Sequence, residues 1–300
     1  MSPSRKGLLH GAAAYGIWGI VPAYWKLLKA VDPIELIAHR ALWGLGAFGV
    51  LVAIAGQGTA LRMALRDRRT VGVMLLSATL LAVNWSLFIW ATLRGHLLDA
   101  SLGYFINPLV SVALGTIVLG EKLRRLQWVA IALAAGGVGV LTWRAGQVPW
   151  IALVLASTFG SYGLVRKLAK VEALVGSTIE TIVMVPVALG YLFVIGGGAL
   201  VHEGPSTVLL LVGTGVITAV PLIFFTSAAR LLPLSTVGFL QYLAPTGQFL
   251  LAVLAFGEPL AHEKLVAFAL IWTGLAVFSL DLWRAAHSER SARVSTSAPE

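Results

Sequence analysis

The sequence predicts an all-α integral membrane protein: ten transmembrane helices as two inverted five-helix repeats. Composition is the first of three observations behind this prediction. Charged residues make up only 12% of the 300 residues, hydrophobic residues make up 58%, and the mean hydropathy is +0.88. A water-soluble domain of this length needs more charge to cover its surface, so the composition indicates a membrane protein. The other two observations are an internal repeat and the distribution of lysine and arginine.

The internal repeat is clearest in residues 84–128, where Pro108 lies inside an apolar run that ends in a Gly-Glu pair. Residues 233–260 repeat both features at an offset of 137 residues, which places Pro108 on Pro245. This shared offset predicts two copies of one unit. Because proline removes a backbone donor and clashes with the preceding turn, we expect a helix break at each of the two prolines.

Apolar runs between charged residues or Pro/Gly breaks give ten candidate spans, each near the ~20 residues needed to cross a bilayer. These spans are 7–27, 34–55, 70–93, 99–119, 126–143, 149–165, 173–195, 206–229, 234–256 and 264–282. The first five-helix repeat therefore covers residues 7–143 and the second covers residues 149–282. The remaining polar tail, 283–300, is predicted to be cytoplasmic and disordered.

Lysine and arginine gather on one side of these spans. With a cytoplasmic N-terminus, sixteen of them fall in inside segments and five in outside links, and Arg40 lies within a span. This bias predicts that both termini are cytoplasmic. Because each repeat holds an odd number of helices, the second copy is inverted relative to the first. Inverted repeats are a recurrent architecture of transporters, which bind substrate near the midplane between the repeats.

Several motifs between residues 7 and 282 resemble a known family. They are Trp25-Lys26, Ala38-His39-Arg40, Asn84-Trp85, the run LGYFINPL at 102–109, Gln241-Tyr242-Leu243-Ala244-Pro245 and the two Gly-Glu pairs. In these motifs the chain resembles the EamA family of the drug/metabolite transporter superfamily, and within it the RarD-type subfamily. The resemblance implies ten helices and export of a small metabolite or drug. The label "chloramphenicol-sensitive" that RarD-type proteins carry names a phenotype, not a substrate.

Charged residues inside the spans are the first candidates for a site, since a charge at the centre of a membrane helix costs about 2.5–3.5 kcal/mol. Arg40 and Glu180 lie well inside their spans. After a small gap the alignment of the two repeats has an offset of 140, which places Arg40 on Glu180. We expect both to face a central cavity and to pair, directly or through His39. A structural ion pair that fixes helix packing is the alternative.

Polar and aromatic side chains at depth complete the predicted cavity, with helix packing as the alternative role of each. The predicted substrate-binding residues are His39, Arg40, Trp43, Asn84, Trp85, Tyr104, Asn107, Glu180, Gln241 and Tyr242, with helix breaks at Pro108 and Pro245. Four tryptophans at span ends are expected at the membrane surface instead. They are Trp25, Trp143, Trp150 and Trp283.

Glu121 and Glu258 end their apolar runs, where a carboxylate opposes the negative end of the helix dipole. We therefore expect each to bond the N-terminus of the next helix. Direct coupling to protons is the second interpretation.

The sequence contains no nucleotide-binding loop and no enzyme motif, so we expect neither ATP-driven transport nor catalysis. The prediction is a secondary or facilitative transporter, exporting a small amphipathic metabolite or drug by alternating access. A membrane scaffold or receptor without transport activity is the alternative. We expect no cofactor, metal or nucleic acid, and there is no cysteine. The expected partners are a small-molecule solute and the bilayer of the inner (plasma) membrane, while a homodimer is left undecided.

Overall fold

The computed structural model describes residues 2–94, 97–145, 150–255 and, towards the C-terminus, 265–266, 269–274, 276–278, 280–281 and 284. This described part is helical and contains no strand. Its elements are α1 (Pro3–Leu27), α2 (Pro33–Ile54), α3 (Gly58–Arg66), α4 (Arg68–Leu93), α5 (Leu97–Leu119), α6 (Arg125–Ala145), α7 (Trp150–Leu168), α8 (Ala173–Val194), α9 (Ala199–His202), α10 (Pro205–Leu231), α11 (Leu234–Leu240), α12 (Leu243–Leu250) and the π-helical turn η1 (Leu251–Ala255).

Six segments of the described chain are long and apolar enough to cross a membrane. They are α2, α4, α7, α8, α10 and the segment Leu234–Ala255. Shorter apolar helices at Gly103–Leu119, Arg125–Val140 and Ala269–Phe278 match three further predicted spans, and α1 occupies the first. The predicted all-helical character, with helices able to cross a membrane, is confirmed for the described residues.

Local sequence determines where α2 and α4 begin. The Asp32 side chain accepts a hydrogen bond of 2.8 Å from the backbone two residues on, and Pro33 takes the first helical position of α2. Asp67 caps α4, accepting from the Thr70 hydroxyl at 2.5 Å and from the Arg69 backbone at 3.1 Å. These hydrogen bonds hold the pKa of Asp67 below its usual range. The cap therefore contributes fully above the unfolded-state pKa and is lost as pH falls through the lower folded-state pKa.

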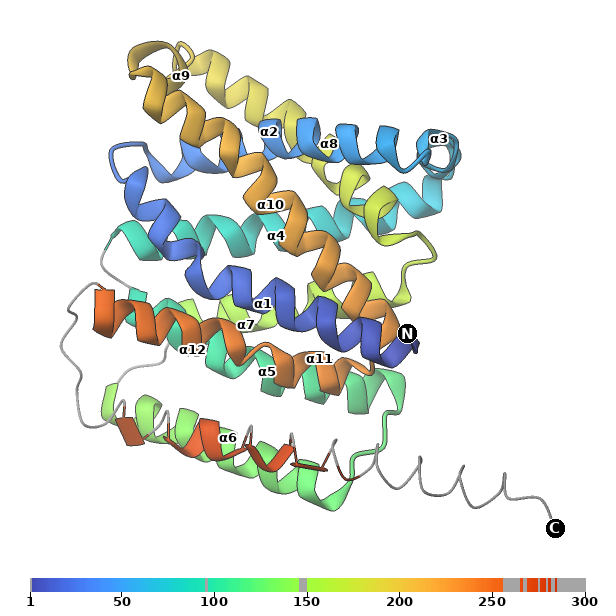
Figure 1. The fold of residues 1–300 in the computed structure, drawn as a ribbon, viewed down its shortest axis with the longest axis vertical. Helices are drawn as coiled ribbons and strands as arrows, with labels where there is room; N and C mark the ends of the chain where they lie inside the picture. Colours follow the sequence, from blue (N-terminus) through green and yellow to red (C-terminus); the bar gives the residue numbers. More distant parts are fainter. Residues whose placement is uncertain are drawn as a thin grey trace.

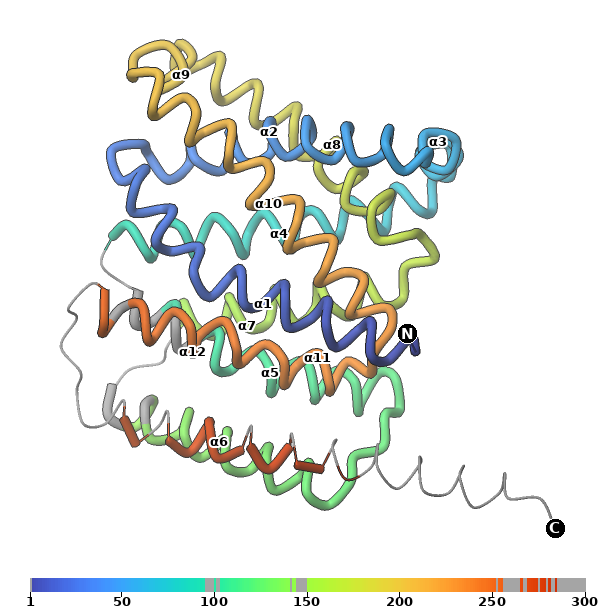
Figure 2. The backbone as a smooth tube through the Cα atoms, viewed as in Figure 1, coloured from blue at the N-terminus to red at the C-terminus, as the bar shows by residue number. Residues whose placement is uncertain are grey.

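The long helices pack side by side into one bundle (Figure 1), and Figure 2 traces the same path through the Cα atoms. In it α2 packs against α8 and α10, α1 against α10 and α12, α4 against α7 and α8, and α5 against α7 and α11. The largest buried apolar cluster joins α1, α2, α4, α7, α10, α11 and α12. At one edge lies α6, where a Cβ on Gly274 would come 2.8 Å from the Ala130 carbonyl oxygen.

Glycines allow the closest of these helix contacts. A Cβ on Gly247 of α12 would lie 3.0 Å from the Cα of Gly19 in α1. Likewise, a Cβ on Gly103 of α5 would lie 2.9 Å from the Ala152 carbonyl oxygen in α7. Between membrane helices, such close backbone packing takes the place of a hydrophobic driving force. These glycines therefore bring α12 onto α1 and α5 onto α7.

The helix break predicted at Pro108 is wrong, because α5 continues through this residue. A membrane helix tolerates proline where its neighbours pack closely around it. Here α11 does so, since a Cβ on Gly238 would lie 3.0 Å from the Pro108 carbonyl oxygen. Pro108 is buried in this contact.

The break near Pro245 is present, although it precedes the proline. The structure ends α11 at Leu240 and begins α12 at Leu243, so the break lies at Gln241–Tyr242. The ring of a proline clashes with the carbonyl four residues earlier, which for Pro245 belongs to Gln241. Pro245 is also buried.

Glu121 caps a helix, but not the next helix of the chain. Its carboxylate accepts hydrogen bonds from the Leu234 backbone at 2.7 Å and from the backbone and hydroxyl of Ser235 at 3.1 and 2.8 Å. The capped helix is α11, whereas the prediction named the helix that follows α5, which is α6. The reason is packing: α5 lies against α11, whose free N–H groups attract a carboxylate. Glu258 lies outside the described residues.

Replacing Glu121 with alanine removes this cap, so we expect the free energy of unfolding to fall by about 0.5–2 kcal/mol, the usual cost of losing a helix cap. Chemical unfolding of the purified protein in detergent measures the change. Lys122→Ala is the matched control, because Lys122 is the exposed neighbour of Glu121. Equal effects of the two substitutions would contradict the capping role.

Candidate functional site

A small cavity lies in the centre of the bundle, between helices of both halves of the chain. Its volume is about 50 Å³, and half of its lining residues are aromatic. The lining residues are Tyr15, Trp18, Val21, Trp25, Arg40, Asn84, Trp85, Phe88, Tyr104, Asn107, Phe159, Gln241, Ala244 and Gln248. The cavity thus brings together six of the ten residues predicted to bind substrate.

Arg40 is the charged residue of the cavity wall. Its guanidinium carbon lies 4.0 Å from the centre of the Trp85 ring and 4.9 Å from that of Trp25, and its Nε donates to the Thr218 hydroxyl at 3.2 Å. Among the described residues, no carboxylate lies within ion-pair distance of it. Cation–π contacts, worth about 2 kcal/mol or more when desolvated, therefore take the place of an ion pair.

Hydrogen bonds fix the orientation of two side-chain amides in the cavity wall, those of Asn84 and Gln248. The Asn84 side-chain nitrogen donates to the Leu155 carbonyl at 2.9 Å, and the Gln248 nitrogen donates to the Trp18 carbonyl at 3.2 Å. A carbonyl only accepts, so the nitrogens must face these groups and the amide oxygens must point elsewhere. Both oxygens are buried and have no donor within the described part of the protein. Such acceptors are available to a solute that carries N–H or O–H groups.

Two further amides lie on the same wall. The Gln241 nitrogen donates to the Ser111 hydroxyl at 3.3 Å. Its oxygen, like the side-chain oxygen of Asn107, finds no donor among the described residues. Gln248 is not among the residues predicted from the sequence, although a signal for it exists. Residues 241, 244 and 248 follow the helical spacing of three and four residues, which places them on one face.

The aromatic wall centres on Trp18, whose ring lies 5.6 Å from Phe159 and 5.5 Å from Tyr15, edge to face. Trp25 belongs to this wall as well, which corrects its predicted place at the membrane surface. Its side chain is only 2% exposed, because Arg40 lies over its ring.

Of the other three tryptophans predicted at the membrane surface, two are exposed. Trp143 is 86% exposed and Trp150 is 55% exposed. Trp283 lies outside the described residues.

Three predicted site residues lie away from the cavity. His39 points to Glu35 on the same helix, with 3.4 Å between its Nε2 and the carboxylate, so it bridges nothing to Arg40. Trp43 packs its backbone against α10, where a Cβ on Gly215 would overlap the Trp43 carbonyl oxygen. Tyr242 is buried against Phe105 and Phe239.

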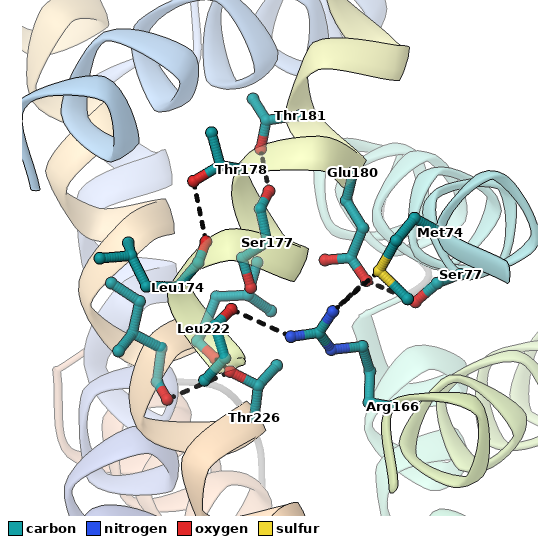
Figure 3. Close-up of polar contacts among 12 residues, drawn as sticks. Met74, Ser77, Arg166, Leu174, Ser177, Thr178, Glu180, Thr181, Leu222 and Thr226 are labelled. Atoms are coloured by element: carbon teal, nitrogen blue, oxygen red, sulfur yellow. Dashed lines mark hydrogen bonds and ion pairs between the residues drawn. The ribbon is translucent and has the colours of Figure 1, made fainter. Parts of the chain in front are cut away.

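Glu180 is the fourth, and the predicted pairing of Arg40 with Glu180 is wrong. Glu180 instead accepts a short hydrogen bond from the Ser77 hydroxyl and lies 3.4 Å from the guanidinium of Arg166 (Figure 3). Arg166 directly follows the predicted span 149–165 and is one of the sixteen lysines and arginines that the sequence predicts on the cytoplasmic side. The helix α7 continues to Leu168 and turns the Arg166 side chain inwards, where it is 1% exposed.

Comparison with known proteins identifies the family. The model of the EamA-like transporter family matches residues 5–143. Protein RarD of Escherichia coli (strain K12) is 48% identical over 281 residues, which is 93% of this chain and 95% of that protein. The chain belongs to the EamA-like transporter family, RarD type. An uncharacterized transporter of Vibrio cholerae is 44% identical over 97% of both proteins.

A solved crystal structure has the same fold, with a TM-score of 0.72 at 22% identity, and the match covers 93% of this chain and 99% of that one. EamA membership and the apolar helices together show a multi-pass membrane transporter of the RarD type. The transporter names of its relatives agree with the prediction that the chain is not an enzyme.

The two buried arginines of this EamA-family chain give a thermodynamic prediction. In a double-mutant cycle on the free energy of unfolding, Arg166→Met and Glu180→Gln should couple by about 0.5–3 kcal/mol, as residues in contact do. Arg40→Met and Glu180→Gln should add within about 0.3–0.5 kcal/mol, as separate sites do. Strong coupling of Arg40 to Glu180 would show instead that these two side chains share one site.

Proposed function

We propose that the protein is a secondary or facilitative transporter that exports an amphipathic organic solute by alternating access. The solute binds in the central cavity. The observation that carries this proposal is the Arg40 guanidinium, which lines an aromatic cavity with no carboxylate of the described residues beside it. An acidic group on the solute would supply the missing counter-charge, in a site where burial strengthens a charge-assisted hydrogen bond.

The other wall groups support the same class of solute. The free oxygens of Asn84 and Gln248 accept hydrogen bonds, so the solute would carry N–H or O–H donors as well. The rings of Trp18, Phe88 and Phe159 suit an apolar or aromatic body. The solute is therefore a small amphipathic molecule with an acidic group at one end.

The size of the cavity supports alternating access. Pockets that hold organic ligands occupy roughly 300–1,000 Å³, whereas this cavity measures about 50 Å³. Solute binding consequently requires the surrounding helices to move apart. In transporters built from repeats, such movement opens one side of the membrane at a time.

We further propose the inverted repeats, 7–143 and 149–282. Helix contacts support them, because the most extensive contacts have counterparts under the exchange of α1 with α7, α2 with α8, α4 with α10, and α5 with α11 and α12. The contact of α1 with α10 matches that of α7 with α4, and the contact of α5 with α7 matches that of α12 with α1. The exchange maps the contact of α2 with α8 onto itself, and it does the same for the contact of α5 with α11. The cavity lies where these pairs meet.

Arg40→Ala should reduce solute transport into inverted membrane vesicles by about tenfold or more, since a lost hydrogen bond to a charged group costs about 1.5–3 kcal/mol. A panel of radiolabelled aromatic acids, with chloramphenicol included, serves as the probe. Arg68→Ala is the matched control, because Arg68 is exposed at the start of α4. If no panel member accumulates with the unaltered protein, the scaffold or receptor alternative gains support.

The topology prediction is tested with single cysteines, which the cysteine-free chain allows directly. Cysteines at Gly204 and at Gln147, which lies outside the described residues, should react with a membrane-impermeant maleimide added to intact cells. Cysteines at Arg68 and Ala169 should react only after lysis. Reversed labelling would overturn the proposed inner-membrane orientation with both termini in the cytoplasm.

A further inference from the structure

A buried ion pair outside the central cavity holds α7, α8 and α4 together (Figure 3). The Arg166 guanidinium of α7 lies 3.4 Å from the Glu180 carboxylate of α8, and both side chains are 1% exposed. From α4, the Ser77 hydroxyl donates to the same carboxylate oxygen. A charged pair at this depth gives weak evidence for stability alone, because desolvation offsets the attraction.

The hydrogen bonding of this pair is incomplete. The second carboxylate oxygen of Glu180 is buried without a partner among the described residues, and so are the hydroxyls of Ser177 and Tyr162 and the Nε of Arg166. The Tyr162 hydroxyl lies beside the carboxylate without hydrogen-bond geometry. A proton on Glu180 would create a donor next to neighbouring hydroxyl acceptors. The cluster therefore has the groups to hold the acid as well as the carboxylate.

A pocket of about 490 Å³ leads towards this pair from the ends of α4 and α7. Its lining includes the charged residues Asp67, Arg69 and Lys170, and on the inner side Met74. The sulfur of Met74 in turn accepts a contact of 3.1 Å from the Arg166 guanidinium. The Met74 side chain thus contacts both the pocket and the buried pair.

The backbone leaves space for this arrangement. Gly176 lies one helical turn before Glu180 on α8, and a Cβ there would overlap a guanidinium nitrogen of Arg166. A second guanidinium nitrogen donates to the Ala173 carbonyl at 3.0 Å. Arg166 is therefore held against the start of α8, and a side chain at position 176 would displace its guanidinium.

We propose that Glu180 is a proton-binding site that exchanges its proton with the cytoplasm through the α4–α7 pocket, and that its occupancy couples transport to the proton gradient. As carboxylate, Glu180 pairs with Arg166 and ties α8 to α7. When a hydronium ion in the pocket gives its proton to the free oxygen, Glu180 becomes a neutral acid, water is left behind, and the ion pair with the still positive Arg166 is lost. The coupling rests on the proposed transport function, but the proton site does not.

The groups that face Glu180 are few. Arg166 and Tyr162 face it from α7, and Ser77 and Met74 lie on the α4 side. The helices α2, α3 and α10 also pack against α8. From these three helices, no charged side chain of the described residues comes within ion-pair distance of Glu180. Among the described residues, Arg166 is thus the one cation that would lose its ion pair when Glu180 is protonated.

Dicyclohexylcarbodiimide tests the site without any solute. It reacts with a protonated carboxyl in apolar surroundings: the acid adds across one C=N bond, and the product rearranges to a stable N-acylurea.

Mass spectrometry of the purified protein in lipid should find Glu180 labelled at mildly acidic pH, with labelling falling as pH rises. Met74→Ala should speed labelling severalfold, and Gly176→Ala, which displaces Arg166, should extend it to higher pH. The exposed Glu172, at the start of α8, is the internal control and should stay unlabelled.

Absence of Glu180 labelling at every pH, in both the unaltered protein and Met74→Ala, would overturn the proton site. The coupling has a separate test in vesicles, where an imposed pH gradient should speed transport by the unaltered protein and have no effect on transport by Glu180→Gln. A response that persists in Glu180→Gln would overturn the coupling. Labelled Glu180 in a protein that transports no solute would support the proton site while contradicting the proposed function.

Discussion

The guanidinium of Arg40 lies within the apolar bundle, where a charge costs about 2.5–3.5 kcal/mol even on the lenient insertion scale. Two indole rings and one hydroxyl surround it, in place of a carboxylate. These partners come from α1, α4 and α10, so stabilising one cation requires three helices to converge on α2. The cavity is the space that this convergence leaves. Its aromatic walls therefore serve both to bury the cation and to accept an apolar solute.

The second buried arginine, Arg166, differs from Arg40 because it has a carboxylate partner. Arg166 has a carboxylate, a carbonyl oxygen and a thioether sulfur as partners, and these come from α8 and α4. The cation in the cavity is thus available to a solute, whereas the cation between α7 and α8 already has its counter-charge. Separate sites of this kind can serve separate roles, solute recognition and proton exchange, without competing for one side chain.

The end of α7 connects the two sites. Next to Arg166, the Lys167 ammonium donates to the Leu232 carbonyl at 2.6 Å and lies 3.9 Å from Glu121, the cap of α11. The same α11 ends at Leu240, directly before Gln241, which lines the central cavity. A movement of α7 after loss of the Arg166 ion pair would therefore act on the junction that holds the cavity wall. This connection is a chain of contacts between the proposed proton site and the wall of the cavity.

The sequence by itself determined the helical class, the approximate spans and the starts of α2 and α4. The reason is that these features depend on local properties: apolar runs of sufficient length, charged links, and capping residues such as Asp32 and Asp67. It also indicated six of the cavity residues, because polar and aromatic groups at depth are rare enough to stand out. Family membership followed from short motifs, which are local as well.

Only the tertiary structure decided which side chains meet. The predicted alignment of the repeats placed Arg40 and Glu180 at matching positions, but a position along a helix does not fix the direction in which a side chain points. That direction depends on how each helix is rotated against its neighbours, and contacts such as that of Gly176 with Arg166 set the rotation of α8. Glu121 likewise capped a helix more than a hundred residues away, because its partner is set by the packing of α5 on α11 and not by chain order.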